Sequence, residues 1–349
     1  MQKTILGKIN TMVLIAAVFS MFSCSKDSED INDLGETIFV RHKKADMAAY
    51  VHGNASEKVF LILLHGGPGG TGLQYRNNTI KSKIEKNNAI VYFDQRGSGN
   101  SQGKYSEADV SIDLMAEDVL ALVKVLKTKY GNDSKFFLMG HSWGGTLGPA
   151  TLLKDQEEFV GWINVDGNHD PKGSYEAYKI ALKKVADEQI SLKNSSNYWK
   201  GVLDLIQNVG ANYSKSDFYK LNRKAHESEG TLADNKVINQ SRSDGQSDSH
   251  YNPFTTLWNS GQIQSILVDK GLFEKVSYTD RLSEITIPSL VLWGKHDIIV
   301  PAVYAQEAYD NLGSSDKELF VFEKSAHSPM DTEPDLFAEK VINFINRHK

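Results

Sequence analysis

Near its middle the chain contains the stretch Phe136-Phe137-Leu138-Met139-Gly140-His141-Ser142-Trp143-Gly144-Gly145-Thr146. Its apolar start is long enough for a buried strand, and residues 145–153 can continue as a helix. Ser142 is therefore expected on a sharp strand-to-helix turn, where the flanking glycines leave room for closely packed backbone. The pattern fits G-x-S-x-G, in which the serine hydroxyl is exposed at the end of a sheet and the N–H of the next residue, Trp143, points at a developing oxyanion.

Upstream segments extend this strand into a sheet. Val59–Leu64 is apolar on both alternating faces and leads into His65-Gly66-Gly67-Pro68-Gly69-Gly70, and Ala89–Phe93 leads into Asp94-Gln95-Arg96-Gly97. A run with helical periodicity from Ser111 to Tyr130 precedes the serine segment. Alternating strands and helices predict an α/β fold with a mostly parallel central sheet flanked by helices.

Three motifs, in this order, resemble the proline iminopeptidase family of α/β-hydrolases: His65-Gly66-Gly67-Pro68-Gly69, Asp94-Gln95-Arg96-Gly97 and Gly140-His141-Ser142-Trp143-Gly144-Gly145. The resemblance covers roughly residues 59–167 and 285–347. It implies the α/β-hydrolase fold and a lidded serine hydrolase that commonly acts as an aminopeptidase.

The character of the sequence changes after residue 167. We expect a first part of the hydrolase core over residues 36–167, a helical cap over 168–280 and a second part of the core over 281–349. Helical stripes are predicted at 175–186, 198–209 and 218–226, and the Ser-, Asp-, Asn- and Gly-rich residues 227–252 are expected to form a surface loop. A cap of this size would exclude water and select substrates.

A serine nucleophile needs a base, and the base needs an acid to orient it. The order nucleophile, acid, base is met by Ser142, Asp297 and His327, with the last two each just after a predicted strand. Two alternatives stay open: Asp166, which also ends a predicted strand, as the acid, and His296 as the base.

The oxyanion hole is predicted to combine the N–H of Trp143 with that of Gly67, and Gly66 is a further candidate donor. His65 and His141 flank the site and are interpreted as structural. Asp94 and Arg96 are interpreted as residues that hold loops together.

The pattern of the amino terminus predicts a bacterial lipoprotein signal. Lys3 and Lys8 precede an apolar run from Met12 to Phe22, which is too short to span a bilayer. Residues 21–24 resemble a lipobox, which implies lipidation at Cys24 after removal of residues 1–23, with residues 24–35 as an acidic tether. The predicted location is the cell envelope, through a lipid anchor in a membrane; an ordinary signal peptide is the alternative.

The formal net charge of −5 and the absence of a clustered run of Lys or Arg argue against nucleic acid as a partner. No cofactor is expected, because the glycine loops match neither a dinucleotide-binding nor a Walker pattern. No metal is expected, because the histidines lack H-E-x-x-H spacing and Cys24 is the single cysteine.

The expected substrate is a small peptide or an acyl compound. An aminopeptidase must bind a free ammonium group with carboxylates, and the resemblance implies that cap glutamates do so; those available are Glu176, Glu188, Glu227 and Glu229. A carboxylesterase or lactonase is the alternative among enzymes, and an envelope binding protein without activity is the alternative outside them.

Overall fold

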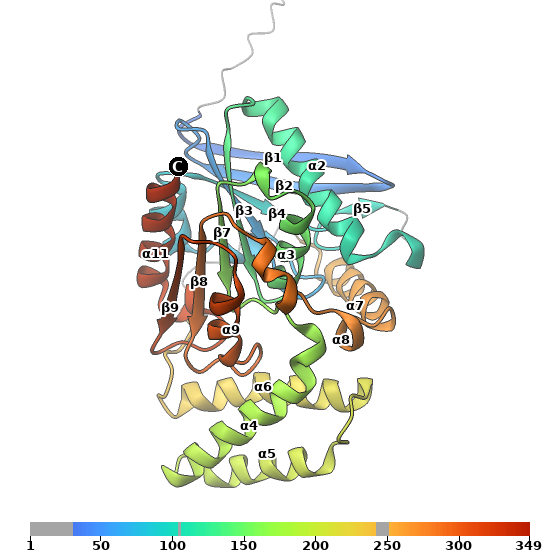
Figure 1. Cartoon of the computed structure of the whole chain (residues 1–349), viewed down its shortest axis with the longest axis vertical. Helices are drawn as coiled ribbons and strands as arrows, with labels where there is room; N and C mark the ends of the chain where they lie inside the picture. Colours follow the sequence, from blue (N-terminus) through green and yellow to red (C-terminus); the bar gives the residue numbers. More distant parts are fainter. Residues whose placement is uncertain (1–30, 104–105, 242–250) are drawn as a thin grey trace, which may run out of the picture. The chain divides into compact units, whose positions relative to one another are not determined.

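The computed structural model describes residues 31–103, 106–241 and 251–349 (Figure 1). The predicted signal peptide, Cys24 and the first part of the predicted tether lie outside these residues. Among the described residues, a nine-stranded sheet has the order β1-β2-β4-β3-β6-β7-β8-β9, with β5 paired to β2. The strands are β1 Leu34–His42, β2 Ala45–Gly53, β3 Val59–Leu64, β4 Ala89–Phe93, β5 Gln102–Gly103, β6 Lys135–His141, β7 Gly161–Val165, β8 Ser289–Gly294 and β9 Lys317–Phe322.

From β4 across to β9 all neighbouring strands pair in parallel, whereas β1, β2 and β5 are joined by antiparallel pairing. The predicted mostly parallel sheet is thus confirmed. The carboxyl ends of β6, β7, β8 and β9 meet at one edge, which is where ligand-binding side chains of parallel sheets gather.

Helices cover both faces of the sheet because alternate residues of its central strands point to opposite sides. Phe60, Ile62 and Leu64 of β3 pack in one core cluster with residues of α2, whereas Leu61 and Leu63 pack in a second cluster with residues of α11. Figure 1 shows α2 and α3 on one side of the sheet and α11 on the other. The helices of these layers are α2 Ile112–Tyr130, α3 Gly144–Asp155, α9 Val303–Asn311, α10 Pro329–Thr332 and α11 Pro334–His348.

The boundaries of α2 follow from local chemistry. Ser111 precedes the helix, and its side chain accepts a hydrogen bond from the N–H of Leu114. Such a cap satisfies one of the helix's unpaired first N–H groups. The helix ends at Tyr130, and the next residue is Gly131, whose φ of 116° is open to glycine and strained for other residues.

Between β7 and β8 the chain runs through five helices of the described residues, where the cap is expected. They are α4 Ser174–Ser191, α5 Ser196–Asn208, α6 Lys215–Asp234, α7 Pro253–Asp269 and α8 Leu272–Lys275. Helix α4 packs against α5 and α6, and α8 packs against the turn at residues 171–173.

One expectation in this region is wrong. The composition of residues 227–252 predicts a surface loop, but α6 continues to Asp234. Its buried positions Leu221, Ala225, Ser228 and Leu232 are spaced by three or four residues, so one face of the helix stays in the core well past residue 227. Residues 235–241 follow without helix, and 242–250 lie outside the described residues.

Within the parts of the chain that the structure describes, no helix is long and apolar enough to span a bilayer.

Candidate active site

The serine turn is formed as the sequence predicts. Strand β6 ends at His141, α3 begins at Gly144, and Ser142 between them has a φ of 56°. This left-handed conformation is strained for a residue with a side chain. A Cβ on Gly144 would lie 2.3 Å from the carbonyl oxygen of Leu64, and one on Gly145 would lie 2.2 Å from the Cα of Gly167. The glycines therefore permit the close packing that holds the strained serine in place.

Asp297 and His327 come from the loops that follow β8 and β9. Nδ1 of His327 lies 2.9 Å from Oδ2 of Asp297. Oδ1 of Asp297 accepts hydrogen bonds from the N–H groups of Ile299 and Val300, at 2.8 and 2.9 Å. With three donors around it, this carboxylate is fixed in position, and it in turn fixes the orientation of the imidazole ring.

The environment of His327 suits a proton acceptor. Burial lowers the pKa of His327 to about 3, so at neutral pH the ring is uncharged. Because Asp297 faces Nδ1, that nitrogen carries the proton and Nε2 keeps a free lone pair. The ring can therefore take a proton from a hydroxyl placed at Nε2.

His141 supports the loop that carries His327. Its Nε2 donates to the carbonyl oxygen of His327 at 2.7 Å, so its Nδ1 accepts from the hydroxyl of Tyr75, also at 2.7 Å. The Tyr75 oxygen accepts the N–H of Gly66 at 2.8 Å. The structural interpretation of His141 fits this chain of bonds, although its side chain also lines the site.

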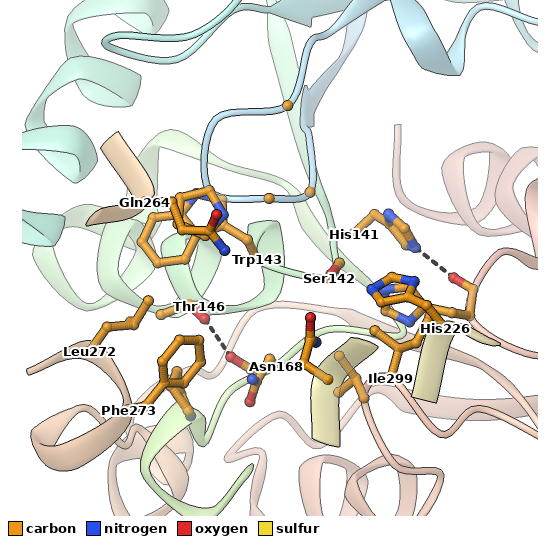
Figure 2. Close-up of a pocket in the computed structure, with 18 of the residues that line it drawn as sticks. His141, Ser142, Trp143, Thr146, Asn168, His226, Gln264, Leu272, Phe273 and Ile299 are labelled. Atoms are coloured by element: carbon orange, nitrogen blue, oxygen red, sulfur yellow. Dashed lines mark hydrogen bonds between the residues drawn. The ribbon is translucent and has the colours of Figure 1, made fainter. Parts of the chain in front are cut away.

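A cavity of about 410 Å³ opens between the sheet edge and the helical insertion. Ser142 and His327 both line it, whereas Asp297 lies behind His327 and is buried. Figure 2 shows Ser142 between His141 and His226 on one side and Trp143 and Thr146 on the other. The inserted helices contribute aromatic, aliphatic and uncharged polar side chains: Tyr178, Phe218, Asn222, His226, Ser260, Gln264, Leu272 and Phe273. The volume suits a small ligand.

The backbone around the cavity offers donors for an oxyanion. Gly67 and Trp143 both line the cavity, and the N–H of Gly67 donates to no acceptor among the described residues. The N–H of Gly66 is instead occupied by Tyr75. Of the three predicted donors, Gly67 and Trp143 therefore remain as candidates. The indole of Trp143 is buried and donates to Oε1 of Gln95 at 2.8 Å, so its side chain packs beside the turn.

The loop residues interpreted as structural have structural contacts. Asp94 accepts from the N–H groups of Gly72 and Asn100, both at 2.8 Å. The Arg96 guanidinium is fully buried and binds both oxygens of Asp118, at 2.6 and 2.8 Å. His65 is buried, with Nε2 2.9 Å from the hydroxyl of Ser98.

Neither alternative to the predicted triad, His296 as the base or Asp166 as the acid, has the contacts of the predicted residues. His296 is absent from the described lining of the cavity. Asp166 is fully buried at the end of β7, and it faces Asp297 rather than the base. The hydrogen bond to His327 is made by Asp297.

Of the four cap glutamates, one lies near the base. Glu176 and Glu227 form surface ion pairs with lysines of their own helices, and Glu188 is exposed. The carboxylate of Glu229 accepts from the N–H of Ile298 at 3.2 Å and from that of His327 at 3.4 Å.

None of the described residues that line the cavity is Asp or Glu. Which cap residues face the cavity could not be read from sequence, because helical periodicity does not tell which neighbour each face meets.

Comparisons with known proteins agree with this architecture. A family model described as the alpha/beta hydrolase fold matches residues 59–334. A probable aminopeptidase of Bacillus subtilis is 25% identical over 85% of this chain and 91% of its own length. A proline iminopeptidase of Saccharolobus solfataricus is 28% identical over 82% of this chain and 84% of its own. The crystal structure of a proline iminopeptidase-related protein from Thermus thermophilus matches with a TM-score of 0.61 at 19% identity, covering 90% of this chain and 98% of the other.

Proposed function

The chain belongs to the α/β-hydrolase family, and from this premise we propose that it is a serine hydrolase whose nucleophile, base and acid are Ser142, His327 and Asp297. The observation that carries the proposal is the 2.9 Å bond between Asp297 and His327 at a cavity that the strained Ser142 also lines. Among the described residues the Ser142 hydroxyl has no hydrogen-bond partner, and in enzymes without ligand such bonds often tighten only when substrate binds.

In the proposed reaction His327 takes the proton of Ser142 as the oxygen attacks the substrate carbonyl carbon. The N–H groups of Gly67 and Trp143 stabilise the oxyanion. His327 then gives the proton to the leaving group, which departs and leaves an acyl-enzyme. Water, activated by the same histidine, hydrolyses the ester and restores Ser142. Asp297 stabilises the imidazolium during both steps.

We propose an aminopeptidase of the proline iminopeptidase type, because the relatives that cover most of the chain carry these names. Such an enzyme must hold the ammonium group of the substrate. We assign this role to Glu229, which is not itself in the described cavity lining but whose carboxylate contacts the backbone of His327 and of Ile298, beside Ile299 in the cavity wall. Burial raises the pKa of Glu229, so a bound ammonium would stabilise its ionised form.

An esterase or lactonase is the second candidate function. The observation in its favour is the described lining itself, which presents His226, Asn222 and Gln264 but no carboxylate. Such a lining suits a neutral acyl group as well as a charged one.

Activity on proline naphthylamide and on a short nitrophenyl ester, measured in parallel, tests the proposal. We expect the peptidase substrate to have the higher kcat/KM. Glu229→Gln should lower kcat/KM for the naphthylamide by about 10–100-fold, since it removes a charge-assisted bond to the ammonium, and should leave the ester much less affected. Glu188→Gln, at an exposed position of α4, is the matched control. Turnover of the ester alone, or equal losses on both substrates in Glu229→Gln, would argue for the esterase.

We also propose that the protein is held in the cell envelope by a lipid on Cys24, which lies outside the described residues. The Cys24→Ser protein should move from the membrane fraction to the soluble fraction, because the lipid has no other attachment point among the cysteines. Fractionation followed by immunoblotting measures this. If Cys24→Ser stays with the membranes, the anchor is elsewhere.

A further inference from the structure

The acid of the proposed triad is one of three buried carboxyl groups that meet behind His327. Asp297 follows β8, Asp166 follows β7, and Glu229 lies on α6 of the helical insertion. Asp166 and Glu229 both lie against the carboxyl group of Asp297, close enough for side-chain hydrogen bonding. Burial, the largest cause in each case, raises the pKa of all three. Three carboxylates in contact in a buried site repel one another strongly, so at least one carries a proton.

Counting donors shows which group is left without a partner. Asp297 accepts from two N–H groups and from His327. Glu229 accepts from two N–H groups, one to each oxygen. Asp166 has one, since Oδ1 accepts from the N–H of Gly294 at 2.8 Å. Its Oδ2 is buried and meets no donor among the described residues.

A buried carboxylate oxygen with no donor is costly, but a carboxylic acid O–H at the same place can itself donate. The group in contact with Asp166 is the Asp297 carboxylate, which is an acceptor. A proton on Asp166, whose Oδ2 lacks a donor, would therefore convert the repulsive contact with Asp297 into a hydrogen bond. Asp166 has a φ of 44°, a left-handed conformation that is strained for a residue with a side chain and that the surrounding structure must maintain.

We propose that Asp166 is a neutral carboxylic acid that donates a hydrogen bond to Asp297, and that it acts as a positioning residue for the triad. The inference rests on the proposed function only for its consequence in catalysis. The O–H of Asp166 adds a fourth donor to the anion that orients His327, and its Oδ1 holds Gly294 at the start of the loop that carries Asp297.

Infrared spectroscopy of the full-length protein at neutral pH tests the protonation directly. The carbonyl-stretch band of a protonated carboxylic acid should be present in the parent and missing from Asp166→Asn. It should remain in Glu229→Gln, the matched control within the cluster. If the band is absent from the parent, or disappears in Glu229→Gln and survives in Asp166→Asn, the proposal is overturned. This measurement needs no activity, so it stays decisive even if the proposed reaction is wrong.

Activity tests the positioning role. An asparagine can accept from Gly294 and donate to Asp297, so Asp166→Asn should keep kcat within about 3-fold of the parent, whereas Asp166→Ala should lose roughly 10–100-fold through the missing bond to a charged group. A loss in Asp166→Asn as large as that in Asp166→Ala would contradict the role. Thermal unfolding of both variants identifies loss through misfolding.

The pH profile gives a further readout. Besides its own three carboxyl groups, the cluster is faced by His327 after β9 and Tyr178 from α4. His327 is in turn faced by His141 at the end of β6 and His226 from α6. If Asp166 were ionised, its replacement by a neutral amide would remove a negative charge near His327, lower the imidazolium pKa and move the acid limb of kcat/KM to lower pH. Because we infer that it is already neutral, the acid limb of Asp166→Asn should coincide with that of the parent. A shift to lower pH would overturn the proposal.

Discussion

Ser142→Ala should lower kcat by roughly 10⁴–10⁶-fold on every substrate that the protein hydrolyses. The hydroxyl is the proposed nucleophile. Ser260, the other serine in the described cavity lining, lies within α7 and not on the strained turn. Alanine fits the same backbone, since the Cβ is already present, so the variant should fold. Steady-state kinetics on the naphthylamide and ester substrates, with thermal unfolding alongside, measure both effects.

The control for this variant is Ser191→Ala, at an exposed position near the end of α4. Its kcat should match that of the parent. If Ser142→Ala folded and kept ordinary activity, Ser142 would not be the nucleophile.

Asp297→Asn should cost about 10⁴-fold in kcat. The asparagine oxygen can still accept from Ile299 and Val300, so its NH₂ group is turned toward Nδ1 of His327. Nδ1 must then accept, which moves the proton of the neutral ring to Nε2. The ring in that tautomer cannot take a proton from Ser142, although the shape of the site hardly changes. Because the residues act as a unit, Ser142→Ala with Asp297→Asn should be about as slow as Ser142→Ala alone.

If Asp297→Asn had a mild effect and Asp166→Asn a large one, the acid would be Asp166 at the end of β7. This is the alternative that the sequence leaves open.

The serine turn could be predicted from sequence because its causes are local. Residues 136–146 contain both the apolar strand and the glycines, although the backbone that Gly144 and Gly145 approach belongs to Leu64 and Gly167. The order of Ser142, Asp297 and His327 could also be predicted, since each follows a strand of a parallel sheet.

Other features depend on contacts between distant segments and could not be read in this way. The sequence makes the N–H of Gly66 a candidate donor for an oxyanion, but in the structure it donates to the hydroxyl of Tyr75. Helix α6 continues past residue 227 because its face packs in the core, although the polar composition there favours a loop. The sequence makes Asp166 an alternative acid, whereas its contact with Asp297 and the lack of a donor at its Oδ2 depend on the three-dimensional structure.

Covalent labelling with a fluorophosphonate probe, followed by mass spectrometry of the digested protein, tests the central claim most directly. The probe reacts with a serine activated by a neighbouring base, so we predict a single modified peptide with the label on Ser142, and much slower labelling of Asp297→Asn. A folded protein that takes up no label, or takes it up on another residue, would contradict the claim that Ser142, His327 and Asp297 form one catalytic site.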